Sequence, residues 1–346
     1  MIDVGLLEKL SNAVAVAGAE SEVRKLIRDQ IKDKVVDLTV DALGNLIVRR
    51  AAGSESNLKI MLTAPMDEIG FMVSDVGDNG LISVHSVGRH DLRYLPAARV
   101  VVGSAKTPGV IMSPPIHRWH DQNTKAVDDF QIDTGATGKG GIKVGDRAAF
   151  MGMFAALTDT VVRGKAFESR AACAILIALL DGDPFPYDVY VVFSTQKKVG
   201  TRGAQVAANR IDPDLLISVS GVEADDIPRS PDEDDRGQIV RLGGGPVLNL
   251  KDWVYVTDRP MLDYLVATAD ANNIPYQFST QDAFTEAGMI ATLRDKTVTV
   301  DVSLPVRYLQ SPLSLLNLTD VENTAQLLRT AIMSLTPNTL LKKVTS

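Results

Sequence analysis

The sequence predicts an α/β protein with a smaller all-β domain inserted into it, on three observations. The chain has 346 residues, of which 45% are hydrophobic, so it can form a full core and more than one domain. Helical and strand-like segments alternate over most of its length. Between residues 68 and 159 the pattern changes to short strands separated by Gly, Pro and Asp, which is typical of a small β domain.

The α/β domain is expected to be discontinuous, formed by residues 1–67 and 160–346. Two helices separated at Gly18 come first, followed by a strand hairpin and a core strand within residues 35–64. Residues 187–195 form an apolar, β-branched run typical of a strand buried on both faces. The other expected elements are helices at 169–180, 204–210, 260–272 and 320–334, and strands at 215–220 and 298–304. The acidic stretch 223–238 is expected to be a solvated loop.

Charge and composition exclude several classes of partner. A net charge of −7 argues against nucleic acid and against an anionic membrane surface, since both require a basic patch. No apolar run approaches the length of a membrane span and no signal segment is visible, so a cytoplasmic protein is expected. The single cysteine, Cys173, lies in an apolar helical segment and is expected to be a buried thiol.

Two adjacent lysines, Lys197 and Lys198, follow the strand at 187–195. In open α/β sheets, ligands and catalytic groups collect at the carboxyl ends of such strands. The two ammonium groups are therefore candidates for a functional site.

The resemblance to one family is carried by ten stretches in register: DALGNLI, MDEIGFMV, PPIHRW, IDTGA, VGD, VVRGKAF, SRAACA, PYDVYVVFSTQ, VGTRGA and RYLQSP. The sequence resembles the di-metal aminopeptidases, which include glutamyl and tetrahedral aminopeptidases and proteins labelled cellulase M or endoglucanase. This resemblance implies a zinc-exopeptidase-like three-layer domain with a central mixed sheet. It also implies an inserted β-rich dimerisation domain and self-association, from a dimer up to a dodecamer.

The family's chemistry uses two zinc or cobalt ions, held by two histidines and several carboxylates, with a glutamate as the base. In this chain the family's A-H-M-D-E reads APMDE, so Pro65 stands at the first histidine ligand. Proline has no donor atom for a metal. Asp67, which in the family orients that histidine, is retained without it.

At the other positions that the resemblance identifies as metal ligands or base, this chain also has residues less suited to bind metal or accept a proton. An ammonium group has no lone pair for a cation, and a longer side chain displaces a bridging carboxylate. Arg307 and Tyr308 are retained beside the last ligand position, and TEAG at 285–288 stands where the family has T-D-A-G. The replacements are Glu168 for the bridging Asp, Lys197 for the base Glu, Lys198 for a ligand Glu, Ser220 for a ligand Asp and Gln310 for the second ligand His.

The histidines support the same interpretation without any comparison. All four, His85, His90, His117 and His120, lie in the inserted β segment, so the α/β part has none. A zinc hydrolase site without histidine is unusual. A metal pair formed by His117 and His120 is an alternative, but H-x-x-H alone is a weak signal and a surface loop is favoured.

These residues predict a family member with no metal cofactor and no intact catalytic group. We expect Lys197 or Lys198 to pair with Glu168 or Asp67 in place of the metal ions. The function would be that of a structural or regulatory subunit, assembling with itself or with an active paralogue, or of a binder of peptides or small ligands in the former cleft.

Two alternatives keep an enzyme. Ser194 or Ser220 beside Lys198 could form a Ser/Lys nucleophile pair. Asp67 and Glu168 could retain weak metal-dependent hydrolysis, although two ligands are too few for a tight site.

Overall fold

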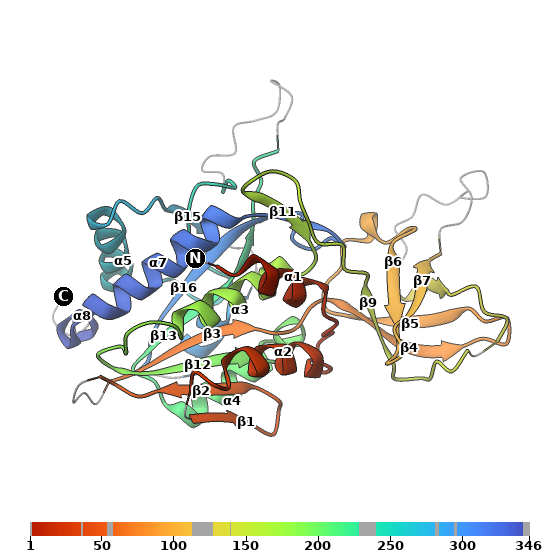
Figure 1. Cartoon of the computed structure of the whole chain (residues 1–346), viewed down its shortest axis with the longest axis horizontal. Helices are drawn as coiled ribbons and strands as arrows, with labels where there is room; N and C mark the ends of the chain where they lie inside the picture. The colour runs from red at the N-terminus through yellow and green to blue at the C-terminus, as the bar shows by residue number, and fades with distance from the viewer. Residues whose placement is uncertain are drawn as a thin grey trace.

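The computed structural model describes residues 2–35, 37–53, 58–112, 127–138, 140–227, 240–280, 284–293 and 296–341. Figure 1 shows an α/β domain that contains both ends of the chain and a β-barrel that extends from one end of it. The barrel strands lie between the third strand of the chain and the strands that complete the large sheet. An inserted all-β unit is therefore confirmed, while its limits at residues 68 and 159 stay a prediction.

The large sheet is mixed. Its central strands β12 (Asp188–Ser194), β3 (Lys59–Pro65), β13 (Leu215–Glu223) and β16 (Val298–Arg307) are parallel and almost wholly buried, as their apolar sequences require. Antiparallel strands extend it on both sides. These are β1 (Asp37–Val40) and β2 (Leu46–Arg50) at one edge, and β17 (Ser314–Asn317), β11 (Val161–Gly164) and β10 (Ala155–Ala156) at the other, with β14 (Val247–Lys251) paired to β16 and β15 (Gln277–Thr280) paired to β14.

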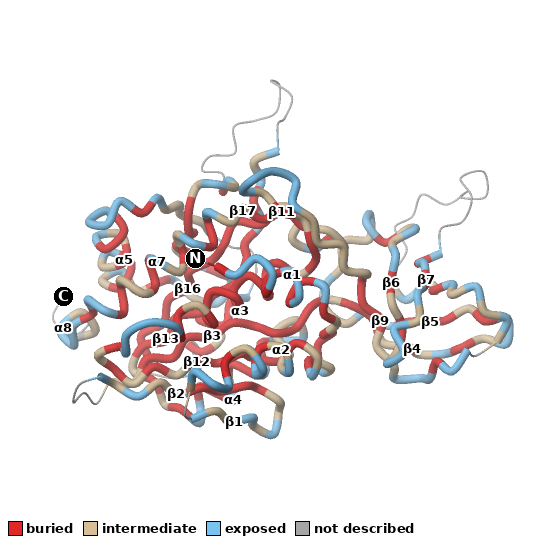
Figure 2. The backbone as a smooth tube through the Cα atoms, viewed as in Figure 1, coloured by how far each residue is buried: buried red, intermediate tan, exposed pale blue. Residues whose placement is uncertain are grey.

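Helices cover both faces of this sheet and make three layers. One face packs against α3 (Phe167–Leu179), which α1 (Val4–Asn12), α2 (Ser21–Ile31) and α7 (Leu318–Ser334) flank in the same layer. In that layer α7 and α5 (Arg259–Ala271) also contact β16, and α8 (Pro337–Leu341) packs against α5. The other face packs against α4 (Arg202–Ile211) and α6 (Glu286–Ala291). Figure 2 shows the buried backbone concentrated in α3 and the central strands. This arrangement confirms the three-layer fold implied by the resemblance.

The inserted unit is a closed barrel with its own core. Its strands β4 (Gly70–Val76), β5 (Ile82–Val87), β8 (Gln131–Asp133), β7 (Thr107–Ile111), β6 (Arg99–Val102) and β9 (Arg147–Phe150) pair in that order around the barrel. Two short 3₁₀ helices, η1 (Leu92–Tyr94) and η3 (Val127–Asp129), lie in its loops. Phe71, Val100, Ile132 and Phe150 fill the interior, separately from the cores of the α/β domain.

The expected helices and strands of the α/β domain are present, with ends shifted by a few residues. Strands β11, β14, β15 and β17 and helix α6, each of four to six residues, were not predicted. Most of the acidic stretch 223–238 lies outside the described residues, and Glu223 is the last residue of β13. No described helix has both the length and the apolar character needed to cross a membrane.

Candidate functional site

The candidate site lies where the parallel strands end. Ser194 at the end of β12 is beside Pro65 at the end of β3, and Ser220 lies near the end of β13. Helix α3 begins directly over this edge. A Cβ on Gly221 would lie 2.7 Å from the Cα of Glu168, so glycine at this position allows α3 to approach the sheet. The sequence thereby places Glu168 over the strand ends.

Both lysines reach Glu168. After β12 the chain turns at Gln196, with a φ of 55°, into the short helix η4 (Lys197–Val199), and both side chains extend toward the start of α3. The Nζ of Lys197 lies 2.5 Å from Oε1 of Glu168, and the Nζ of Lys198 donates to Oε2. The exposed fractions of the three side chains are 10%, 14% and 10% for Lys197, Lys198 and Glu168. The predicted pairing is confirmed for Glu168.

The charges of this cluster are mutually stabilised. Burial alone would raise the pKa of Glu168, but the ammonium groups of Lys197 and Lys198 outweigh burial and hold that pKa at about 2. Burial likewise disfavours the charged form of Lys197. The Glu168 carboxylate favours that form more strongly, so the pKa of Lys197 is raised. At neutral pH the carboxylate is ionised and Lys197 is protonated.

Asp67 is bound to the same turn through the backbone. Its Oδ2 accepts a hydrogen bond of 2.8 Å from the main-chain N of Lys198. Its Oδ1 is buried without a partner among the described residues. Burial raises the pKa of Asp67 to about 6, against the opposing effect of Lys198. An unpartnered oxygen is consistent with the expectation that Pro65 stands where the family has the histidine that this carboxylate orients.

Two further buried carboxyl groups lie near Lys197, and sequence reasoning assigned them no role. Glu286 accepts from Ser194 Oγ at 2.5 Å and from Thr63 Oγ1 at 2.8 Å, and burial raises its pKa to about 7. Asp301 accepts from Ser303 Oγ at 2.6 Å, and burial raises its pKa as well. Lys197 favours the charged form of both. The TEAG stretch was the available signal for Glu286, whereas the burial of Asp301 depends on strand register.

The remaining predicted residues have separate surroundings. Gln310 is exposed and lines, with Glu168 and Lys198, a cavity of about 20 Å³, which has room for one water molecule. Arg307 is bound to Asp226 by two hydrogen bonds of 2.5 and 2.8 Å.

The contacts described for Pro65 and Tyr308 are made by their main chains, and Ser220 is a buried residue of β13. The carbonyl of Pro65 accepts from Cys173 Sγ at 3.2 Å. Tyr308 has a φ of 59°, and its N–H donates to Glu223.

The histidines of the described chain lie in the barrel. His85 pairs with Asp128 at 3.0 Å, and His90 stacks on Phe71 with ring centroids 4.5 Å apart. His117 and His120 lie outside the described residues, so neither the surface loop expected for them nor the alternative metal pair is tested.

The donor set does not fit the family's two metal ions. Pro65 offers no donor, Lys197 and Lys198 offer only protons, and each oxygen of Glu168 already accepts from an ammonium group. Within the described ranges, no group of three or more His, Cys, Asp or Glu side chains is placed to hold a metal.

The contacts of Ser194, Lys197 and Lys198 do not favour a Ser/Lys nucleophile pair. Ser194 donates to Glu286, and the amines of both lysines are bound to Glu168. A lysine acts as a base only when it is neutral, and the Glu168 carboxylate favours the protonated form.

The sequence profile of the M42 glutamyl aminopeptidase family matches residues 44–327. The chain belongs to the M42 aminopeptidase family. A putative aminopeptidase of Acetivibrio thermocellus is 33% identical over 94% of this chain and 97% of its own length. The resemblance identified from the sequence motifs is thus confirmed.

Solved M42-like structures share the whole fold. An aminopeptidase from the archaeon Desulfurococcus kamchatkensis superposes with a TM-score of 0.92 at 30% identity, covering 99% of this chain and 97% of that one. The TET1 peptidase of Pyrococcus horikoshii, which can assemble into a tetrahedron or a large octahedral shell, has a TM-score of 0.84 at 28% identity, covering 96% and 99%. The barrel and the α/β domain are therefore retained together in this chain.

Proposed function

We propose that this M42 family member has no metal-dependent peptidase activity and acts as a structural or regulatory subunit of a larger assembly. The observation that carries the proposal is the Lys197–Glu168–Lys198 cluster. Two ammonium groups bind one buried carboxylate. By the resemblance of the sequence motifs, they stand where the family has its base and one of its ligands, and the carboxylate stands where the family has its bridging ligand. Positive charge that metal ions would supply is supplied by the chain itself.

The subunit role rests on what the chain retains. The barrel has its own closed core, and the fold superposes over nearly its full length on peptidases of the family. A related peptidase with 28% identity assembles into shells. The chain would assemble through the barrel with itself or with an active paralogue, from a dimer up to a dodecamer. This assembly would use the barrel, which is retained, and not the strand ends, where the ligand residues differ.

The test combines an activity assay with a mass measurement. Purified protein, with zinc or cobalt added, is assayed on aminoacyl-p-nitroanilides carrying acidic, basic and apolar residues, and its mass is measured by light scattering. We expect no hydrolysis above a blank and an assembly larger than a monomer. Turnover that a chelator abolishes would overturn the loss of activity, and a monomer at all concentrations tested would overturn the subunit role.

A gain-of-function variant provides the matched control for the assay. It carries the family's residue at each altered position: Pro65→His, Glu168→Asp, Lys197→Glu, Lys198→Glu, Ser220→Asp and Gln310→His. We expect this variant to bind zinc, because the substitutions restore imidazole and carboxylate donors at the strand ends. Zinc binding by this variant and not by the unmodified chain would assign the difference to these residues.

A binding role is the second candidate, and one cavity favours it. A space of about 450 Å³ lies between barrel residues, including Tyr94 and Met153, and the loop that carries Tyr308 and Pro312. Its volume falls within the range of small-ligand pockets, unlike the 20 Å³ space beside Glu168. A thermal shift with amino acids or short peptides, lost in Tyr94→Ala, would support it; no shift with any of them would contradict it.

A further inference from the structure

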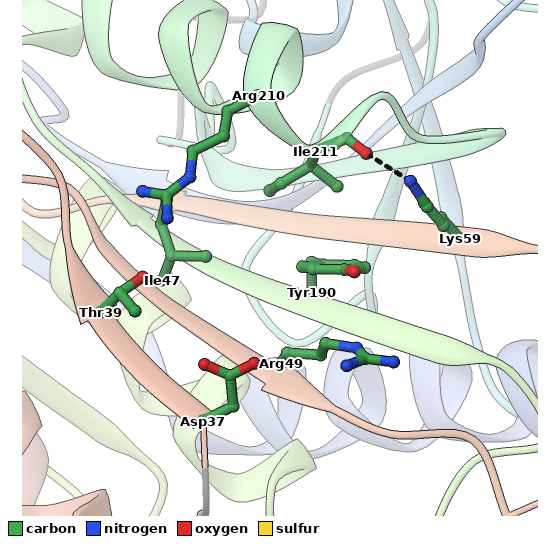
Figure 3. Close-up of a pocket in the computed structure, with 8 residues that line it drawn as sticks. All are labelled: Asp37, Thr39, Ile47, Arg49, Lys59, Tyr190, Arg210 and Ile211. Carbon is green, nitrogen blue, oxygen red and sulfur yellow. Dashed lines mark hydrogen bonds between the residues drawn. The ribbon is translucent and has the colours of Figure 1, made fainter.

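A separate cavity of about 220 Å³ lies at the other end of the parallel strands, under the last turn of α4 (Figure 3). Strand register brings its walls together. Asp37 on β1 is opposite Arg49 on β2, and Arg49 is opposite Tyr190 on β12. Thr39 is likewise opposite Ile47, so these side chains share the face that α4 covers only in part.

The charge of this cavity is opposite to that of the whole chain. Arg49, Lys59 and Arg210 line it together with a single acidic residue, Asp37, in a protein whose net charge is −7. Arg49 is paired with Asp188 outside the lining, at 2.7 Å, so one positive charge remains in excess. A local cationic pocket on an acidic protein attracts small anions.

Arg210 carries that excess charge. Lys59 donates to the main-chain carbonyl of Ile211 at 3.1 Å, and Arg49 is held by Asp188. The side chain of Arg210 has no hydrogen bond or ion pair with any residue in the described part of the chain. Figure 3 shows its guanidinium extending from α4 toward Ile47 and Thr39. A guanidinium in this position can bind a carboxylate or phosphate through two parallel hydrogen bonds.

The rest of the cavity is suited to a flat apolar group. The Tyr190 ring is partly buried and lies between Ile211 and Arg49 in Figure 3. Burial raises the pKa of its hydroxyl, so the ring is neutral at physiological pH. The volume is below the roughly 300–1,000 Å³ of pockets for drug-sized ligands, which excludes a dinucleotide or a peptide and leaves room for one small ring.

We propose that this cavity binds a small organic anion, whose carboxylate or phosphate group pairs with Arg210 and whose planar body packs against Tyr190. The Thr39 hydroxyl also lines the cavity and could donate a second hydrogen bond to that anionic group. The inference does not depend on the fate of the metal site, because the two sites lie at opposite ends of the parallel strands.

The test uses phenyl phosphate and benzoate as probes, with inorganic phosphate and phenol as their separate halves, measured by isothermal titration on the assembled protein. We expect saturable binding of at least one planar anion, and weaker binding of both halves. Arg210→Gln should weaken that binding about tenfold or more, equivalent to about 1.4 kcal/mol. Tyr190→Leu should reduce the affinity for phenyl phosphate toward that for inorganic phosphate.

Arg202→Gln is the matched control, because Arg202 is exposed on the same helix and does not line the cavity. Its affinity for the probes should equal that of the unmodified chain. The proposal is wrong if neither planar anion binds saturably, or if Arg210→Gln and Arg202→Gln bind alike. Equal affinity for inorganic phosphate and phenyl phosphate would refute the role given to Tyr190.

Discussion

Replacing Glu168 with Gln should be among the most destabilising single changes at the strand ends. The substitution keeps the size of the side chain and removes its charge, which leaves the ammonium groups of Lys197 and Lys198 facing a neutral amide in a largely buried cluster. Removing one partner of a buried ion pair typically costs about 3–5 kcal/mol. The loss of free energy of unfolding should lie in this range.

The pKa of Glu168 gives an independent magnitude. It falls from the usual 4.5 to about 2 in the folded chain. Because a tenfold change in the proton equilibrium corresponds to about 1.4 kcal/mol, this favours the ionised form by roughly 3 kcal/mol. Since the folded pKa is depressed, this stability is present above pH 4.5 and is lost as the pH falls toward 2. Glutamine imitates the protonated form, so the loss should appear at neutral pH.

Urea unfolding at fixed protomer concentration measures this loss, since assembly makes apparent stability depend on concentration. Glu322→Gln is the control, because Glu322 is exposed on α7 and should change the free energy by no more than about 0.5 kcal/mol. Adding Lys197→Met and Lys198→Met to Glu168→Gln should recover part of the stability, because the uncompensated charges are then removed. Equal effects of Glu168→Gln and Glu322→Gln would refute the reasoning.

Three further changes test the surroundings of this cluster. Burial raises the pKa of Glu286 to about 7, so between pH 4.5 and 7 the folded chain keeps a proton that the unfolded chain releases. The free energy of unfolding should therefore fall as the pH rises from 4.5 to 7. In unfolding curves measured across this range, Glu286→Gln should reduce that pH dependence. Asp67→Asn should raise the free energy of unfolding at pH 7, because burial disfavours the charge of Asp67, and a lower value would contradict this. Lys197→Glu with Lys198→Glu should lower the melting temperature by bringing carboxylates together, and added zinc should raise it again in this variant but not in the unmodified chain.

The sequence predicted those parts of the fold that are formed by long apolar segments. The strands β3, β12, β13 and β16 are apolar runs of seven to ten residues, and their order follows the family motifs. The short strands at the other edge gave no such signal. Strand β14 interrupts its apolar residues with Asn249, whose side chain is needed for a hydrogen bond to Asp301 inside the sheet.

The charged residues of the site could be predicted from the sequence, but the way in which they contact one another could not. Opposite charges at the strand ends predicted that Lys197 or Lys198 would pair with Glu168 or Asp67, but not that both lysines bind the Glu168 carboxylate. That outcome depends on the turn at Gln196 and on the close approach of α3 to Gly221. The cavity beside Arg210 could not be predicted at all, because strand pairing in the folded sheet is what brings residues of β1, β2, β3 and β12 together beside the end of α4.

The metal content of the purified protein tests the central claim most directly. Protein prepared without chelators and dialysed against zinc or cobalt should contain well below one ion per protomer by plasma mass spectrometry, because the altered positions offer protons and no free carboxylate. Two ions per protomer, retained through gel filtration and accompanied by release of N-terminal amino acids from peptides, would contradict it.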